Sequence, residues 1–195
     1  MEAIIFDVDG VLIHSKNDAG QYLWSQHIQS ELGLETQHLA KIYSGNWDLV
    51  MKGKFCMRQH LNHVFSGLQL AVSVDSFIDY WLKGDLRINN DIVSLVRSIK
   101  QSKLYLGTNQ DILRARVIWD IFGKDFDGFF PSCNIGAIKP EVEFFRHIEN
   151  TLNLSPHEIA FVDDSKSHVK AATKRGWVCH HYKDIEELKQ FIKKL

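Results

Sequence analysis

The sequence of 195 residues predicts an α/β protein built on a parallel β-sheet with helices on both faces. Three short apolar runs, at residues 3–6, 104–106 and 159–162, each end at a polar turn, as buried parallel strands do. Segments with the period of an α-helix lie between these runs. Because strands and helices alternate, the strands are expected to form a parallel sheet that helices cover on both sides.

The helices of this unit are predicted from apolar spacing and from helix-end signals. Residues 111–122 carry one apolar stripe, and a helix that begins at Pro140 carries a second. Residues 155–158 form a capping-box pattern that is expected to cap a single turn. One further helix is expected to end at residues 174–176, where two basic residues precede a glycine. Another is expected over residues 184–194, because its first turn is acidic and its last turn is basic. The two stripes contain Ile112, Ala115, Ile118, Trp119 and Phe122, then Phe144, Phe145, Ile148 and Leu152.

Residues 15–86 interrupt the alternation of strands and helices. They contain no convincing strand, and glycines separate several segments of helical period. We therefore expect residues 1–14 and 87–195 to form one unit and residues 15–86 to form a helical insert. The helices expected in the insert span residues 19–32, 36–43, 57–65 and 74–83.

The composition excludes several classes of protein. The 23 Lys and Arg nearly balance the 24 Asp and Glu, and no basic block stands out, so neither nucleic acid nor an anionic membrane is an expected partner. No run approaches the length of a membrane span, and the chain opens on a strand in place of a secretory signal. The three scattered cysteines do not suggest a disulfide framework. We expect a cytoplasmic protein.

Polar residues follow each of the three predicted strands. Ligands of open parallel sheets bind beyond the carboxyl ends of the strands, so these side chains are expected to meet. Asp7 and Asp9 would repel each other there unless a cation or a reacting group compensates their charge. Hard oxygen ligands with positions left for water and phosphate suit Mg²⁺. The residues expected to meet are Asp7, Asp9, Thr108, Asn109, Asp163 and Asp164.

Four segments in this order, "FDVDGV", "LGTN", "IKP" and "FVDDS", resemble the motifs of the haloacid dehalogenase-like (HAD) hydrolase superfamily. The resemblance covers residues 1–14 and 87–195. The insert at residues 15–86 lies where that family has a helical cap. The resemblance implies a Rossmann-like core, a small all-helical cap and a phosphatase that requires Mg²⁺.

The resemblance also implies roles for the catalytic residues. Asp7 would be the nucleophile that becomes an aspartyl phosphate. Asp9 would protonate the leaving oxygen and then activate water. Thr108 and the backbone of Asn109 would hold the phosphoryl group. Lys139 would contact that group as well and neutralise the charge that it shares with the nucleophile.

The metal ligands that the resemblance implies are Asp7, the backbone carbonyl of Asp9, and Asp164. Asp163 would lie behind Asp164 and orient it. His168 departs from the family pattern, since Asp or Asn is common at that position. This departure puts in doubt whether the position helps to hold the metal.

An acid at Asp9 favours phosphoryl transfer, because the family branches that cleave carbon–halogen and phosphonate bonds lack it. The expected substrate is a small phosphorylated metabolite such as a sugar phosphate, since a small cap can close over it. Asn46, Lys54 and Arg58 are the cap residues expected to contact it. A phosphosugar mutase similar to β-phosphoglucomutase and a non-catalytic binding protein of the same fold are the alternatives. We expect a monomer or a weak homodimer.

The insert offers one further candidate site. On a helix, Cys56, His60 and His63 would share one face within reach of a soft metal. Such a site lacks a fourth ligand, so ordinary packing is the preferred interpretation. The large aromatic residues of the insert are expected to form its own core. They are Trp24, Tyr43, Phe55, Phe65, Phe77 and Trp81.

Overall fold

A computed structural model describes residues 1–17 and 19–195, and its strands form one five-stranded, fully parallel sheet. The strand order is β3-β2-β1-β4-β5, so the three strands predicted from the sequence occupy the centre. The predicted α/β class is therefore confirmed. The strand bounds are β1 Ala3–Phe6, β2 Lys103–Thr108, β3 Gly128–Pro131, β4 Ile159–Asp163 and β5 Val178–His181.

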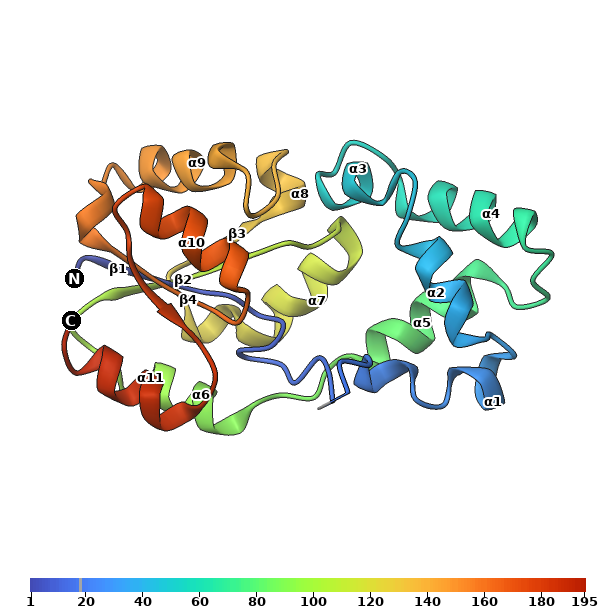
Figure 1. Ribbon diagram of the computed structural model, residues 1–195, viewed down its shortest axis with the longest axis horizontal. Coiled ribbons are helices and arrows are strands. Elements are labelled where there is room, and N and C mark those ends of the chain that lie inside the picture. The colour runs from blue at the N-terminus through green and yellow to red at the C-terminus, as the bar shows by residue number, and fades with distance from the viewer. Residues whose placement is uncertain (18) are drawn as a thin grey trace.

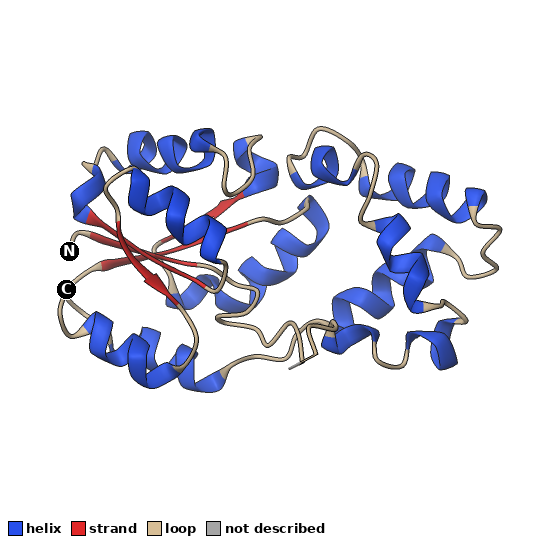
Figure 2. Ribbon diagram, viewed as in Figure 1, coloured by secondary structure: helices blue, strands red, loops and turns tan. Residues whose placement is uncertain are grey.

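Alternating residues of the buried central strands supply two separate hydrophobic cores. Ile4 and Phe6 of β1 point to one face, and Ala3 and Ile5 point to the other, because successive side chains of a strand lie on opposite faces. Helices cover both faces, as Figures 1 and 2 show. The first face packs against α6 Asn90–Ser98, α7 Ile112–Phe122 and α11 Ile185–Ile192, and the second packs against α9 Val142–Leu152 and α10 Lys166–Lys174.

Two predicted helices differ in detail from the sequence analysis. α9 begins at Val142, two residues after Pro140, because Glu141 takes the extended conformation of a helix N-cap. In α7, Ile112 and Trp119 are exposed, whereas Arg114 is buried on the side that faces the rest of the protein. The remaining short elements of the core are η2 Gly123–Asp125, α8 Ser132–Ile135 and η3 Pro156–Glu158, the last of which has the predicted capping box.

The insert forms a helical lobe with a hydrophobic cluster of its own, beside the end of the sheet (Figure 1). The prediction of one helix over residues 19–32 is wrong, because this segment contains only the short elements η1 and α1. Asn17 instead closes a turn, accepting from the N–H groups of Gly20 and Gln21, so the helix starts later. The domain boundaries stay a prediction. The elements of the lobe are η1 Leu23–Ser25, α1 Ile28–Leu32, α2 Thr36–Ile42, α3 Trp47–Met51, α4 Met57–Gly67 and α5 Val74–Gly84.

Among the described residues, no helix is long and apolar enough to cross a membrane.

Candidate active site

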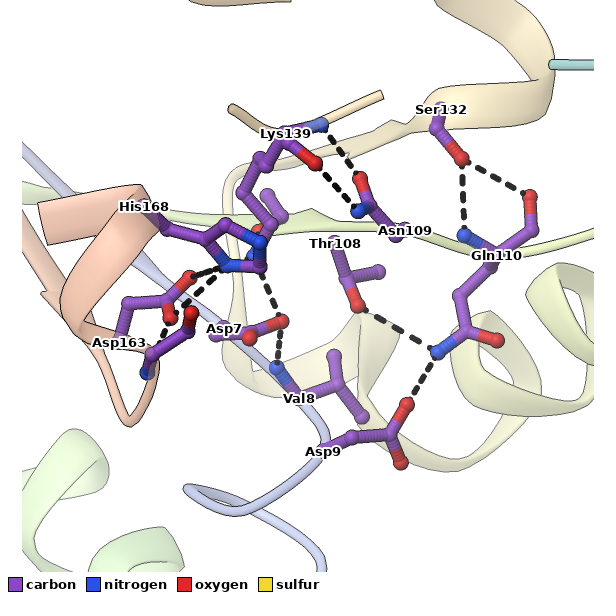
Figure 3. A network of polar contacts seen from close by, with 12 residues as sticks. Asp7, Val8, Asp9, Thr108, Asn109, Gln110, Ser132, Lys139, Asp163 and His168 are labelled. Atoms are coloured by element: carbon purple, nitrogen blue, oxygen red, sulfur yellow. Dashed lines mark hydrogen bonds and ion pairs between the residues drawn. The ribbon is translucent and has the colours of Figure 1, made fainter. Parts of the chain in front are cut away.

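Five of the six polar residues predicted to meet lie together at the carboxyl edge of the sheet in Figure 3: Asp7, Asp9, Thr108, Asn109 and Asp163. Asp7 follows β1 directly, Thr108 ends β2 and Asp163 ends β4. β1 pairs with both β2 and β4 in parallel, so the three strand ends are neighbours. The sheet register therefore brings together side chains that are far apart in the sequence.

Lys139 is the cation at the centre of this cluster. Its ammonium group lies 2.9 Å from Asp7 Oδ1 and 2.6 Å from Asp163 Oδ2, and it donates to the Gly107 carbonyl at 2.9 Å. The residue is 2% exposed. Burial alone would lower the pKa of Lys139, but the two carboxylates outweigh burial and raise it. One buried positive charge is therefore shared between two carboxylates.

Asp7 is buried beside this cation, but Lys139 alone does not stabilise its ionised form fully. Its Oδ1 accepts from the Val8 N–H at 2.7 Å as well as contacting Lys139. Burial raises the pKa of Asp7 well above its usual value, repulsion from Asp163 and Asp9 adds to this, and Lys139 only partly offsets it. A further cation would favour the ionised form that a nucleophile requires.

Asp163 is held on several sides by its neighbours. Besides Lys139, it accepts from the Ser165 N–H at 2.8 Å, and His168 Nδ1 lies 3.1 Å from each of its oxygens. Burial would raise the pKa of Asp163, but these contacts outweigh burial and hold it well below its usual value. His168, whose role the sequence left open, lies against Asp163.

Asp164 is exposed and lies over the turn that follows Asp9. A Cβ atom added to Gly10 would meet Asp164 Oδ2 at 2.2 Å, so this close approach requires glycine. Gly10 also has a φ of 82°, which other residues rarely adopt. The oxygens of Asp7 and Asp164 and the carbonyl of Asp9 are the hard donors that Mg²⁺ prefers. These residues fit the predicted metal.

A second grouping at the site joins two acidic residues to a histidine. Single ligand atoms of Asp7, Asp163 and His168 lie within 4.8 Å of one another. Asp163, however, is already engaged by Lys139 and by the Ser165 N–H. An imidazole nitrogen also suits zinc or copper better than Mg²⁺. We therefore assign Asp163 and His168 to support of the site.

Asp9 belongs to a different cluster, centred on Arg114 of α7. The guanidinium contacts both oxygens of Asp9 at 2.6 Å, and Gln110 Nε2 donates to Asp9 Oδ2 at 2.5 Å. Arg114 also pairs with Asp85, at the end of α5 in the insert, at 2.9 Å. Arg114 thus links the proposed acid and base to the first residue after the last helix of the cap.

The pKa values in this cluster shift in opposite directions. Burial would raise the pKa of Asp9, but Arg114 and Gln110 outweigh it and hold the pKa below its usual value. Burial raises the pKa of Asp85 to about 7, and the charge of Asp9 adds to this, although Arg114 lowers it. The arrangement therefore stabilises Asp9 as a carboxylate.

Residues after β2 connect the site to the rest of the structure. The Asn109 side chain donates to the Lys139 carbonyl at 3.0 Å and accepts from the Lys139 N–H at 2.7 Å, so it orients that loop. Thr108 is buried and accepts from Gln110 Nε2 at 3.4 Å. The Ser132 hydroxyl accepts from the Gln110 N–H at 2.9 Å and donates to the Met51 carbonyl of the cap at 2.6 Å.

A cavity of about 300 Å³ opens beside Asp9 between the core and the cap. Asn46, Lys54 and Arg58, the predicted substrate contacts, are not among the residues that line it. Lys54 and Arg58 line a separate hollow near Leu113, and Arg58 pairs with Asp75. The lining residues of the cavity are Asp9, Ser15, Lys16, Tyr22, Trp24, Tyr43, Trp47, Met51, Trp81, Asp85, Asn109, Gln110, Arg114 and Asp164.

The soft-metal site considered for the insert has little support. His60 is buried, and its Nε2 lies 2.7 Å from the Ile42 carbonyl, so this nitrogen is engaged in packing the cap. Cys56 is exposed at the start of α4.

Sequence reasoning missed Gln110, Arg114, Asp85 and the support from Ser132. One signal was present. Arg114 precedes Ile118 and Phe122 at intervals of four, which places it on the buried side of α7. A charged residue on such a face requires a partner, and a carboxylate was the obvious candidate.

Comparison with known proteins agrees with this fold. The family model for haloacid dehalogenase-like hydrolases matches residues 1–176 of the chain. The sesquiterpene phosphatase AstK of Aspergillus oryzae is 29% identical over 98% of this chain and 96% of that protein. A phosphoglycolate phosphatase of Mannheimia succiniciproducens is 23% identical over 88% of this chain and 80% of that protein. This chain spans only 10% to 35% of several longer curated relatives.

Solved structures show the same fold. The HAD family enzyme BT-2542 of Bacteroides thetaiotaomicron, in complex with magnesium and inorganic phosphate, has a TM-score of 0.80 and 17% identity. That match covers 96% of this chain and 98% of the other. The family model covers most of the chain and the predicted motif residues meet at one edge of the sheet, so the protein belongs to the haloacid dehalogenase-like hydrolase family.

Proposed function

We propose that this hydrolase is a Mg²⁺-dependent phosphatase that cleaves a small phosphomonoester through an aspartyl phosphate on Asp7. The observation that carries the proposal is the position of Lys139 between Asp7 and Asp163, at the strand edge where Thr108 also ends. A buried cation next to a carboxylate can stabilise the negative charge of a phosphoryl group. Phosphatases among the relatives support the same reaction.

The first step transfers the phosphoryl group to the protein. An oxygen of Asp7 forms a bond to phosphorus while the ester P–O bond breaks, and Asp9 gives its proton to the departing alkoxide. Asp9 is held as a carboxylate by Arg114 and Gln110. Proton donation therefore requires Asp9 to be protonated and to turn away from Arg114.

The second step restores the free carboxylate. Asp9 takes a proton from a water molecule whose oxygen attacks phosphorus, the bond to Asp7 breaks, and inorganic phosphate leaves. The carboxylate form that Arg114 stabilises is the form that this step needs. Lys139 and the Thr108 hydroxyl are the groups proposed to hold the phosphoryl oxygens through both steps.

Bound Mg²⁺ would neutralise phosphate charge and favour the ionised form of Asp7. Asp7, Asp164 and the carbonyl of Asp9 are the residues proposed to hold it. Asp164→Ala should weaken Mg²⁺ affinity more than Asp163→Ala does, as measured by titrating each purified variant with the metal. The reverse order would exchange the two assignments.

The test of function is Mg²⁺-dependent release of inorganic phosphate from a panel of phosphomonoesters, with mass spectrometry of the trapped protein. We expect release to stop with a chelator, and a phosphorylated peptide that contains Asp7 to be present in wild type and missing in Asp7→Asn. Transfer of phosphate within a sugar phosphate without its release would indicate the mutase alternative. A folded Asp7→Asn protein with normal turnover would refute the covalent mechanism.

A further inference from the structure

Five aromatic side chains of the cap form a closed ring of neighbours. Tyr22 lies next to Tyr43, with ring centroids 5.6 Å apart, and Tyr43 lies 4.9 Å from Trp47. The ring continues from Trp47 to Trp81 and from Trp81 to Trp24, each at 6.4 Å, and closes between Trp24 and Tyr22 at 6.2 Å. These residues come from four separate segments of the insert, so only the folded cap assembles them.

All five aromatic residues also line the cavity that contains Asp9, together with Met51. The sequence pattern of Trp24, Tyr43 and Trp81 predicts only a place in the cap core. They pack in that core and also line the cavity, whose polar side contains Asp9, Asn109 and Asp164. The phosphate end of a ligand would lie at the polar floor near Asp9, and its organic group would lie against the aromatic wall.

The charges around the cavity argue against a cationic organic group. Arg114 faces the cavity, and Lys16 lies at its margin, 4.9 Å from the centre of the Tyr22 ring. Asp9 and Asp85 are both paired with Arg114. A cationic organic group would therefore meet two positive charges, while Asp164, the third carboxylate of the cavity, is the one proposed to hold Mg²⁺.

The polar groups available on the cap side argue against a sugar. On the cap side, the described lining residues offer the hydroxyl groups of Ser15, Tyr22 and Tyr43 and the indole N–H groups of three tryptophans, which donate but cannot accept. A sugar phosphate carries several hydroxyl groups, and each one buried without a partner loses the hydrogen bonds that it made with water. An apolar group has no such requirement and gains from burial against aromatic rings.

The volume limits the size of the organic group. Liquid water occupies about 30 Å³ per molecule, so a cavity of about 300 Å³ holds about ten water molecules or an organic group of similar size. A simple chain or a single aromatic ring fits within this volume.

We infer that the cavity selects the monophosphate of an uncharged, apolar alcohol of about ten carbon atoms or fewer, in place of the sugar phosphate predicted from the sequence. This inference rests on the proposed phosphatase activity. The relatives do not decide the matter, because one is named for a sesquiterpene and another for phosphoglycolate.

The first experiment measures kcat/KM of the wild-type protein with Mg²⁺ for four esters of primary alcohols. Octyl phosphate and 2-phenylethyl phosphate carry apolar groups, and glucose 6-phosphate and phosphocholine are the polar and cationic comparisons. Because all four leaving groups are primary alkoxides, differences report recognition of the organic group. We expect the apolar esters to be favoured by about tenfold or more. A preference for glucose 6-phosphate or phosphocholine would overturn the inference and leave the phosphatase proposal intact.

A binding measurement separates the two proposals if none of the esters is hydrolysed. Three tryptophans line the cavity, so octylphosphonate is expected to change the intrinsic fluorescence of the protein at concentrations where methylphosphonate does not. Such binding without hydrolysis would refute the phosphatase and support the apolar cavity. Equal affinity for the two phosphonates would refute the apolar cavity.

A matched pair of variants tests the aromatic wall directly. Trp47→Leu should lower kcat/KM for octyl phosphate about tenfold and leave that for glucose 6-phosphate within about twofold. Trp119→Leu makes the same change on α7, outside the residues that line the cavity, and should alter neither value. If Trp47→Leu does not fold, as judged by thermal unfolding, Tyr22→Leu serves instead, since Tyr22 lines the same wall from another segment of the insert. An equal loss with both esters would refute the claim that this wall recognises the organic group.

Discussion

Replacing Arg114 by methionine removes the cation that faces both Asp9 and Asp85. Methionine has a similar length and can fill the buried site without charge. The two carboxylates would then face the same region without their shared partner. We expect Arg114→Met to lower the free energy of unfolding and to impair catalysis, because Asp9 loses the group that orients it.

The expected loss of stability follows from the burial of each partner. Breaking a buried ion pair by removing one member costs about 3–5 kcal/mol, because a charge is left without compensation. The Arg114 side chain is 3% exposed and that of Asp85 is 9% exposed, but that of Asp9 is 33% exposed and can be hydrated. Asp85, whose pKa is already about 7, can also take up a proton. We therefore expect Arg114→Met to lower the free energy of unfolding by about 3 kcal/mol at pH 7.5 and by less at pH 5.5.

Urea unfolding at both pH values, with Arg116→Met as the control, provides the test. Arg116 is exposed on the same helix, so its replacement should change stability by less than about 0.5 kcal/mol. Adding Asp85→Asn to Arg114→Met removes the stranded charge and should recover about 1–2 kcal/mol. Turnover should fall about 100-fold in Arg114→Met, the lower range for loss of a positioned acid or base. Equal stability of the two methionine variants would refute this account of the cluster.

Three further predictions concern single residues. The pKa of Asp85 is raised from 3.8 to about 7, so its protonation stabilises the folded state at acid pH, and this contribution is lost as the pH rises through 7. Unfolding curves from pH 4 to 8 should show wild type losing roughly 4 kcal/mol relative to Asp85→Asn; parallel curves would contradict this. Gly10→Ala should weaken Mg²⁺ affinity by displacing Asp164, whereas Gly45→Ala, which has a positive φ in open space, should cost only ~1 kcal/mol of stability. Equal Mg²⁺ affinities of Gly10→Ala and wild type in a titration would contradict the proposed contact between this turn and Asp164. Asp7→Asn should abolish phosphate release while circular dichroism stays native, because Lys139 keeps its contact with Asp163.

Much of the core and the predicted catalytic cluster could be inferred from the sequence by local rules. β1, β2 and β4 are short apolar runs that end in polar turns, and such runs identify buried parallel strands without reference to the rest of the chain. Because parallel strands end at the same edge, Asp7, Thr108 and Asp163 had to converge. β3 was not predicted, since it is short, begins at a glycine and ends at a proline.

The partners of Asp9 and the wall of the cavity were decided by tertiary packing. Helical periodicity indicates that a face is buried but does not say what covers it, so Arg114 could not be matched to Asp9 and Asp85 from spacing alone. The aromatic residues of the cap showed only that they would be buried. Whether Trp47 would fill a core or face a substrate depended on how the separate segments of the insert pack against the edge of the sheet. Local patterning therefore determined which residues gather at the strand ends, and contacts between distant segments determined the cavity that we propose selects the substrate.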